Sequence, residues 1–470
     1  MTRALYSWLL RLAFPYVCLR VFWRGLRNRD YWRRIPERFG FVPSLGGARV
    51  IWVHAVSVGE VRAAAPLVQA LRARYPGHRI VLTAMTPTGS ATARSLFGDR
   101  VTHCYVPYDY PSVVNRFLDR THPALVLILE KELWPNLVHF SCERGIPVCV
   151  ANAQLGEKSL RGWRRLGTLA TATFGQVRAF AAQTDADARR LVAAGARPEL
   201  AQVMGSIKFD LTLPADLPAR AAALRRNWGA ARPVWLAAST HEGEETEVLR
   251  AHAVLKARFP GLLLVLAPRH PERFDAVARL CERAGFRTLR RSDVQEAQAP
   301  SGEANTALPQ ARTTAGKREV EQRRERLPGD AQLRAATQLA ELPPAVDVLV
   351  GDTMGELQLF YSACDVSFIG GSLVPAGGHN FLEAAAVGKP FVFGPDMSNI
   401  EEIARLAIAC GAGVQIARAE QLAEAIGSFL ADAGRRARAG EAGRRMVEEN
   451  RGALARTLRL IEGLLKPRPD

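Results

Sequence analysis

The sequence lacks several features that would assign it to a class at once. Its seven cysteines form no CxxC pair and no metal-binding spacing, and their odd number favours free thiols in a reducing compartment. It carries no zinc-finger or RNA-recognition signature, although Lys and Arg outnumber Asp and Glu by 63 to 46. The net charge of +17 therefore points to an anionic membrane surface or phosphorylated substrates, and no nucleic-acid partner is expected.

The first forty residues are apolar, aromatic and basic. Residues 4–23 are mostly apolar or aromatic and are interrupted by Arg11 and Arg20. Because each arginine would be costly at the centre of a bilayer, we expect an interfacial helix or a short anchor rather than a clean span. No Ala-x-Ala site is present, so a removable signal peptide is not expected. A soluble helix packed on the body is the alternative.

A cluster of arginines follows, consisting of Arg24, Arg27, Arg29, Arg33, Arg34 and Arg38. Such a cluster binds anionic headgroups on the cytoplasmic side of a membrane. Residues 1–40 are therefore predicted to be a membrane-associated helix with a basic segment.

Short apolar runs alternate with helical segments in two successive halves of the chain. The first half extends from Arg49 to about Ser206, and the same pattern restarts at Val234. Alternation of this kind predicts parallel sheets covered by helices, hence an α/β protein with two Rossmann-like domains. Ligands are expected at the carboxyl ends of the strands, facing a cleft between the domains.

The predicted division follows this pattern. Residues 41–210 form the first domain, 211–218 a linker and 219–470 the second domain. Within the second domain, residues 292–342 have no aromatic side chain and are rich in Ala, Gln, Arg and Glu. Such a segment buries too little apolar surface to order itself, so a mobile surface insertion is expected.

A glycine-rich loop is the most informative local feature. It follows the apolar run 366–369, begins with Gly370, Gly371 and Ser372, and leads into a helix that carries Glu383. Glycines let a backbone approach a phosphate, and a helix N-terminus presents free N–H groups. A carboxylate one turn into the helix suits a ribose hydroxyl. The loop predicts a nucleotide-activated ligand, with a simple tight turn as the alternative.

Two acidic residues stand at the ends of apolar runs in the first half. Glu60 opens a helix after the run 50–54, where the helix dipole would keep an exposed carboxylate ionised, as a general base requires. It could equally be an acid that only stabilises the helix start. Glu130 directly follows the run 124–129 and could stabilise positive charge on a sugar ring. Glu132 is interpreted as a cap of the next helix.

Basic residues occupy comparable places. Arg269 follows an apolar run in the second half and suits a phosphate contact, and Lys208 lies near the domain junction. The DxD motif of the chain, Asp185 to Asp187, follows Thr184 and is interpreted as helix capping rather than a metal site.

Six ordered segments of the chain resemble those of the 3-deoxy-D-manno-octulosonic acid (Kdo) transferases of lipopolysaccharide synthesis. They are residues 52–60, 130–136, 205–210, 267–274, 351–357 and 370–386. The resemblance implies a GT-B fold and transfer of Kdo from CMP-Kdo to the lipid A precursor, lipid IVA, without a metal or cofactor. It places the protein on the cytoplasmic face of the inner membrane.

The resemblance also implies roles for individual residues. Glu60 would be the base, and Glu130 and Lys208 would support the transition state. The positions that match CMP-binding ones are Pro268, Arg269, Met354, Gly355, Glu356, Asn380 and Glu383. Two departures are Lys131, where the family usually has a small hydroxyl residue, and the long insertion.

Two alternatives remain open. One is another GT-B enzyme that acts on a different nucleotide sugar, either a lipid glycosyltransferase or a 2-epimerase. The other is a non-catalytic membrane adaptor that binds anionic lipid through its arginines.

Overall fold

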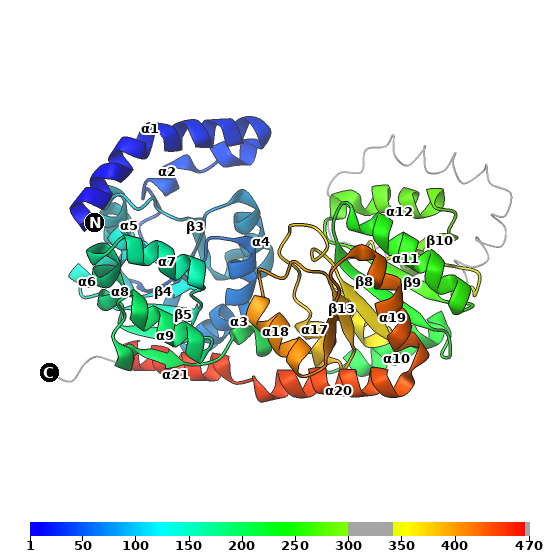
Figure 1. The fold of residues 1–470 in the computed structure, drawn as a ribbon. Helices are drawn as coiled ribbons and strands as arrows, with labels where there is room; N and C mark the ends of the chain where they lie inside the picture. The colour runs from blue at the N-terminus through cyan, green and yellow to red at the C-terminus, as the bar shows by residue number, and fades with distance from the viewer. Residues whose placement is uncertain (299–341, 466–470) are drawn as a thin grey trace. The chain divides into compact units, whose positions relative to one another are not determined.

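The computed structural model describes residues 1–298 and 342–465. The chain divides into two compact units (Figure 1). The first consists of residues 1–211 together with 450–470, and the second of residues 212–449. The central stretch of the predicted insertion lies outside the described residues.

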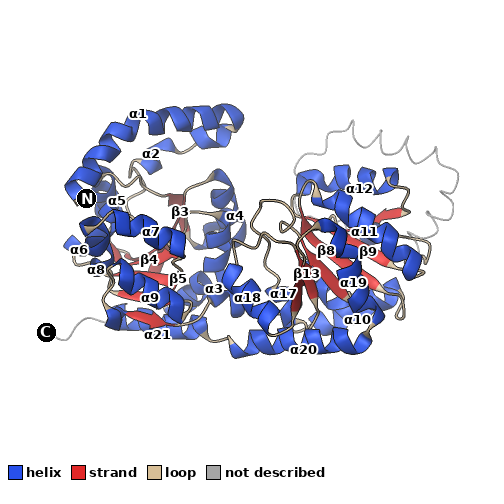
Figure 2. Cartoon of the chain, viewed as in Figure 1, coloured by secondary structure: helices blue, strands red, loops and turns tan. Residues whose placement is uncertain are grey.

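The first unit is built on a parallel sheet of seven strands with helices on both faces (Figure 2). Its strand order is β3-β2-β1-β4-β5-β6-β7, the Rossmann order extended by one edge strand. The strands are β1 (Arg49–His54), β2 (His78–Ala84), β3 (Thr102–Tyr105), β4 (Pro123–Leu129), β5 (Val148–Ala153), β6 (Ala179–Ala182) and β7 (Ala201–Val203).

Alternate residues of each central strand point into two separate apolar cores, one on each face of the sheet. Val50 and Trp52 face one core, while Ile51 and Val53 face the other. Because both faces are covered, these strands are nearly continuous apolar runs. The helices that connect these strands are α3 (Val58–Arg74), α4 (Pro87–Phe97), α5 (Pro111–Thr121), α6 (Pro135–Glu143), α7 (Glu157–Arg165), α8 (Thr168–Gln176) and α9 (Asp185–Ala194).

The last helix belongs to the first unit, which corrects the predicted second domain of 219–470. Helix α21 (Ala453–Leu465) inserts the fully buried Ile461 into the core beneath α3 and α4, where Figure 1 shows it in red against this sheet. Asp210 fixes the start of the segment, because its carboxylate accepts hydrogen bonds from the N–H groups of Gly452, at 2.6 Å, and Leu454, at 2.7 Å.

The second unit repeats the design with the strand order β10-β11-β9-β8-β12-β13-β14. Its strands are β8 (Val234–Thr240), β9 (Leu263–Pro268), β10 (Thr288–Arg290), β11 (Val348–Val350), β12 (Val366–Ile369), β13 (Phe391–Phe393) and β14 (Gly413–Gln415). Its helices are α10 (Leu217–Trp228), α11 (Glu244–Arg258), α12 (Phe274–Arg283), α13 (Arg291–Gln298), α16 (Leu357–Ala363), α17 (Leu382–Ala386), α18 (Glu401–Ala409), α19 (Leu422–Ala431) and α20 (Ala433–Glu449).

The first residues of the predicted insertion, 292–298, are described by the structure and begin with hydrogen bonds to Asp352, which follows strand β11 of the second sheet. The backbone N–H and hydroxyl of Ser292 both donate to Asp352, at 2.9 and 2.6 Å. Residues 292–298 therefore belong to α13, and the expectation that a surface insertion begins at 292 was wrong for these residues. The sequence lacks a local signal for this, because the partner carboxylate lies beyond the insertion.

The N-terminal segment folds as a long helix followed by two short turns. It comprises α1 (Arg3–Arg27), η1 (Arg29–Trp32) and α2 (Ile35–Arg38). Within the described part of the chain, residues 3–26 form the one helix long and apolar enough to cross a membrane. Its apolar side chains are largely exposed, among them Trp8 and Trp23 at 54% and 60%.

Candidate functional site

Glu60 lies in the first turn of α3, where the chain leaves the carboxyl end of β1. Ser57 caps the helix, because its hydroxyl accepts the Glu60 N–H at 3.2 Å. The Glu60 carboxylate reaches back and accepts the N–H of Val56 at 2.6 Å. This arrangement is related to a capping box, but Glu60 accepts the N–H of Val56, the residue before the cap, and not that of Ser57. The spacing of Ser57 and Glu60 could have indicated the cap.

The side chain of Glu60 is buried, which corrects the expectation of an exposed and ionised carboxylate. Only 5% of the residue is accessible. Burial raises the pKa of Glu60 to about 8, and the charges of Glu132 and Glu130 act in the same direction. The hydrogen bond from Val56 opposes this shift but does not cancel it. The carboxyl group can therefore take up a proton near neutral pH, as a general base must.

Glu130 stands directly after β4 in the left-handed backbone region, with a φ of +58°. A non-glycine residue rarely adopts this conformation, and such strain concentrates at functional sites. One carboxylate oxygen of Glu130 lies 3.1 Å from Lys208 Nζ, and both side chains are mostly buried. The structure thus brings together two of the predicted residues as an ion pair.

Asn152 holds this pair in place and was not predicted from the sequence. Its Nδ2 lies 3.4 Å from the bound Glu130 oxygen, and its Oδ1 accepts the N–H of Ile207 at 3.1 Å. Asn152 also has a positive φ, +54°, at a register shift between β5 and β6. A lone Asn within an apolar strand gave no signal, because its role depends on the short helix η4 (Ile207–Phe209), far along the chain.

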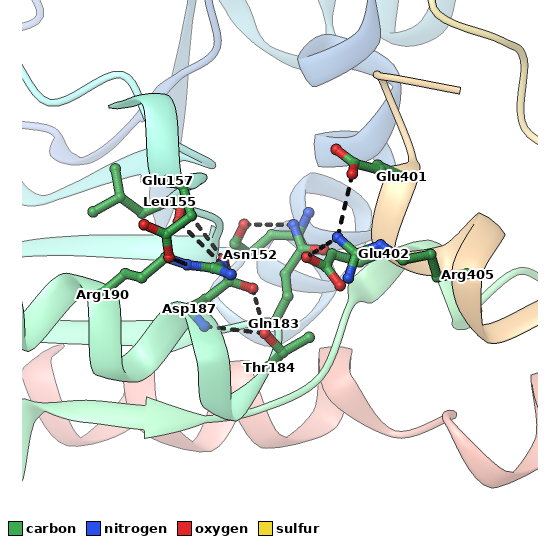
Figure 3. Close-up of polar contacts among 10 residues, drawn as sticks. All are labelled: Asn152, Leu155, Glu157, Gln183, Thr184, Asp187, Arg190, Glu401, Glu402 and Arg405. Carbon is green, nitrogen blue, oxygen red and sulfur yellow. Dashed lines mark hydrogen bonds and ion pairs between the residues drawn. The ribbon is translucent and has the colours of Figure 1, made fainter. Parts of the chain in front are cut away.

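The DxD motif is structural, as predicted. Thr184 caps α9 by accepting the N–H of Asp187 at 3.1 Å, and its hydroxyl donates to the Asp187 carboxylate at 2.7 Å (Figure 3). The other carboxylate oxygen accepts the N–H of Leu155 at 3.0 Å and lies 3.5 Å from Arg190. Both oxygens of Asp187 are therefore occupied by the protein itself.

In the second unit, the glycine-rich loop surrounds a protein carboxylate. Glu244, at the start of α11, is fully buried. Its carboxylate accepts the N–H groups of Gly371 at 2.7 Å, Ser372 at 3.0 Å and Leu373 at 2.9 Å. The N–H of Gly370 also bonds within the sheet, to Ala238, so the N–H groups of Gly370, Gly371 and Ser372 are all occupied by the protein, and the contact of these residues with a donor stays a prediction.

The glycine at the start of this loop is required by a close backbone approach. A Cβ atom at Gly370 would lie 2.5 Å from the carbonyl oxygen of Ser239, at the end of β8. Any side chain there would force the strand ends apart. Glu244 itself escaped prediction because its partners in the loop lie more than a hundred residues further along the chain.

Three histidines gather at the same end of the second sheet, and none was predicted as a site residue. His241 Nε2 lies 2.7 Å from His379 Nε2, and the ring of His270 packs edge-on against His241 at 5.2 Å. Burial lowers the pKa of His241, and the positive charges of Arg269 and Arg273 act in the same direction. Among the described residues, no group of three His, Cys, Asp or Glu is placed to hold a metal ion.

The remaining predicted donor residues lie at or just after strand ends of this sheet. Pro268 ends β9 and Arg269 follows it. Met354 is 64% exposed, and Gly355 has a φ of +86°. Asn380 Oδ1 accepts the N–H of Leu382 at 3.0 Å, and Glu383 accepts the side-chain amide of Gln358 at 3.0 Å.

Glu356 is engaged by its neighbours. Its carboxylate pairs with Arg291 at 2.9 Å and accepts the hydroxyl of Thr353. Burial alone would raise the pKa of Glu356, but these hydrogen bonds and the charge of Arg291 lower it below its usual value. Glu356 is thus an anion that can accept hydrogen bonds from a ligand but not donate them.

Comparison with known proteins matches both halves of the chain to glycosyltransferase families. Residues 33–211 match the family described as 3-deoxy-D-manno-octulosonic-acid transferase (kdotransferase), and residues 326–446 match glycosyl transferases group 1. The chain is 35% identical over 469 residues to the 3-deoxy-D-manno-octulosonic acid transferase of Haemophilus influenzae, covering 99% of both chains. It is 36% identical over 483 residues to that of Bordetella pertussis, covering 99% of this chain and 100% of the relative.

A solved structure resembles the chain in fold. The UDP-GlcNAc 2-epimerase of Neisseria meningitidis bound to UDP-GlcNAc superposes with a TM-score of 0.51 at 14% identity, covering 89% of this chain and 100% of the epimerase. At this identity the likeness concerns the GT-B-like architecture alone, which transferases and epimerases share.

Proposed function

The chain belongs to the Kdo transferase family, and from that premise we propose that it transfers Kdo from CMP-Kdo to lipid IVA in lipopolysaccharide biosynthesis. The observation that carries the proposal is Glu60, a buried carboxyl whose pKa is raised to about 8 at a strand end. The carboxylate of a group with this pKa accepts a proton from a sugar hydroxyl far more readily than that of an exposed glutamate.

The proposed reaction is an inverting displacement. A glucosamine hydroxyl of the acceptor gives its proton to Glu60 while its oxygen attacks the anomeric carbon of Kdo. The bond from that carbon to the CMP phosphate oxygen breaks, and CMP leaves with the electron pair. Glu60 ends protonated and returns the proton to solvent, so atoms and charge balance.

Glu130 and Lys208 are proposed to act on the charge that develops at the sugar. Their ion pair is fixed at 3.1 Å and held by Asn152, so the groups need little rearrangement during the reaction. Preorganised charges of this kind stabilise a transition state more than mobile ones do. The carboxylate faces the positive ring, and the ammonium faces anionic groups of the donor.

The donor is proposed to bind at the strand ends of the second unit. Arg269 would meet the phosphate, and the segment from Met354 to Glu356, with Asn380 and Glu383, would hold the nucleoside. Glu356 and Glu383 are acceptors for ribose and base hydrogens. In this proposal the loop at Gly370 to Ser372 shapes the site through Glu244 and does not bind the phosphate itself.

The N-terminal segment is proposed to dock the protein on the cytoplasmic face of the inner membrane. Helix α1 exposes a series of large apolar side chains, and residues 1–40 contain nine arginines against two acidic residues. Apolar burial in the interface and attraction to anionic headgroups would add to one another.

The test is an incubation of the purified protein with lipid IVA and CMP-Kdo generated in situ, followed by mass spectrometry of the lipid. We expect mass gains of one or more Kdo units that a Glu60→Gln variant fails to produce. A protein that binds CMP but adds no Kdo would instead be an enzyme for a different nucleotide sugar. Nucleotide released from UDP-sugars without any lipid acceptor would identify an epimerase-like activity.

A further inference from the structure

Helix α1 is fastened to the first unit by polar contacts along its first three turns. The N-terminal ammonium donates to the Leu166 carbonyl at 2.9 Å, and the Tyr6 hydroxyl donates to Asp109 at 3.0 Å. The Ser7 hydroxyl donates to Asn136 at 3.0 Å, and the Leu10 carbonyl accepts the hydroxyl of Tyr110 at 3.1 Å. These bonds hold α1 along the body, which suits a helix that lies on a membrane surface.

The second half of α1 covers a groove. Together with η1, α2 and Tyr108, it encloses a cavity of about 430 Å³. The walls are almost entirely hydrocarbon and include Val17, Val21, Phe22, Trp32, Ile35 and Phe39. We call this groove the α1 slot.

The α1 slot has the size and character to take a hydrocarbon chain. Its volume of 430 Å³ is roughly three times the ~150 Å³ of an engineered apolar cavity that binds benzene. An apolar groove next to a helix with exposed apolar side chains would otherwise be filled with water at a cost in free energy. A single acyl chain would fit these walls better than a polar ligand.

One wall of the slot carries a buried cation with unused hydrogen-bonding capacity. Arg38 is 3% exposed, and its Nη1 donates to the Met85 carbonyl at 2.9 Å, while its guanidinium packs 4.0 Å from the Tyr105 ring. Its Nε and Nη2 have no hydrogen-bond partner among the residues that the structure describes. Both atoms are buried in the wall, and the Tyr108 hydroxyl lies beside the guanidinium, so Arg38 contributes positive charge beneath the slot and not a donor that is open to the groove.

Hydrogen bonds connect the slot to Glu60. The carbonyl of Met85 accepts from Arg38, and its N–H donates to the carbonyl of Val56 at 3.1 Å. The N–H of Val56 in turn donates to the Glu60 carboxylate at 2.6 Å. Met85 and Val56 therefore connect Arg38, in the wall of the slot, to Glu60, the proposed base, within one unit.

We propose that the α1 slot binds one acyl chain of the phosphorylated glycolipid acceptor. The proposal rests on the proposed function, because it concerns the acceptor of that reaction. Positive charge beside the slot supports an anionic glycolipid as the occupant. Arg24 lies over the Tyr31 ring at 5.6 Å, and Arg33, whose side chain is 78% exposed, pairs with Asp30 at 3.2 Å. Bulk phospholipid is the competing occupant.

The first test fills the slot and compares two acceptors. Val17→Trp places an indole in the groove, whereas Leu19→Trp adds the same bulk to a residue outside the slot lining that is already 54% exposed. We expect Val17→Trp to raise KM for lipid IVA by about tenfold or more, the loss expected when several methylenes return to water. Both variants should act like the parent protein on the deacylated glucosamine disaccharide phosphate. An equal KM for all three proteins on lipid IVA would overturn the proposal.

The second test measures occupancy without any transfer reaction. Cys18 lines the slot, and Cys410 is the other exposed cysteine of the described chain. In a Cys410→Ser variant, the rate of maleimide attachment at Cys18, located by peptide mass spectrometry, reports access to the groove. Vesicles of phosphatidylglycerol containing lipid IVA should slow attachment several-fold more than vesicles of phosphatidylglycerol alone. Equal rates would assign the slot to bulk lipid or leave it empty, and either result would refute the proposal, whether or not the protein transfers Kdo.

Discussion

The ammonium of Lys208 lies 3.1 Å from Glu130 Oε1, across the carboxyl ends of the first sheet. The positions of both side chains are restricted, since both are mostly buried and the Asn152 amide approaches the same Glu130 oxygen. Such a pair contributes little net stability compared with apolar packing, but breaking it leaves a buried charge without a partner. An arrangement that is costly to maintain and adjoins Glu60 is most simply explained by its use in the reaction.

Replacing Lys208 by Met should impair turnover more than folding. The variant keeps an unbranched side chain but removes the positive charge, so we expect kcat to fall by about 10²–10³-fold, as when one preorganised electrostatic contact is lost. The thermal midpoint should drop as well, because the buried Glu130 carboxylate loses its partner, so kcat is compared at a temperature at which both proteins are folded. Lys158→Met is the matched control, because Lys158 is an exposed lysine of the same unit. A Lys208→Met protein with unchanged kcat would remove the ion pair from the proposed mechanism.

Glu60→Gln tests the base and its pH dependence together. The amide oxygen can still accept the Val56 N–H, so the start of α3 should survive while kcat falls by about 10²–10⁴-fold. In the parent protein Glu60 must lose its proton to act, and its pKa is raised to about 8. Activity should therefore rise with pH towards 8 and level off above it. A flat profile between pH 6 and about 9 would argue against Glu60 as the titrating base.

The same shift makes a prediction about stability. Folding raises the pKa of Glu60 from 4.5 to about 8, so between these values the unfolded chain has released a proton that the folded protein retains. This group therefore makes the protein less stable as pH rises through that window. Urea unfolding should show Glu60→Gln gaining stability relative to the parent between pH 5 and about 8. A constant difference across the range would mean that Glu60 is not shifted.

Much of this architecture was accessible from the sequence. Long apolar runs at β1, β4 and β8 identify the central strands, and the positions of Glu60 and Glu130 follow from these runs. The edge strands β3, β7, β10 and β14 were not predicted, because each of these short segments contains polar residues, whereas the equally short β11 and β13 are entirely apolar. Edge strands also carry more polar residues than central ones.

The misassigned features depend on partners distant in sequence. Helix α21 could be predicted as a helix, but its attachment to the first unit depends on Asp210, whose carboxylate binds Gly452 and Leu454. The glycine-rich loop reads as an anion site, and it is one, yet the anion is the carboxylate of Glu244. No pattern within a single segment reveals either pairing.

Glu244→Gln should loosen the glycine-rich loop. An amide offers one acceptor oxygen where the carboxylate accepts three N–H groups of the loop, and its NH2 group would face other donors. We expect a loss of about 2–4 kcal/mol in the unfolding free energy of the protein by urea titration, together with weaker CMP binding. Glu247→Gln on the same helix is the control, because Glu247 pairs with the neighbouring Arg250 and not with the loop. Parent-like stability would show that the loop does not depend on this carboxylate.

Removing two tryptophans from α1 should weaken membrane binding. Trp8 and Trp23 are 54% and 60% exposed, so their replacement by Ser disturbs few contacts in the folded protein. Because each indole would bury a large apolar area in the interface, we expect partitioning into phosphatidylglycerol vesicles to fall by about 10–100-fold. Val254→Ser, at a residue 55% exposed in the second unit, should leave partitioning unchanged. If the double variant binds vesicles as well as the parent, attraction of the arginines to the headgroups accounts for docking, and raising the salt concentration should then abolish it.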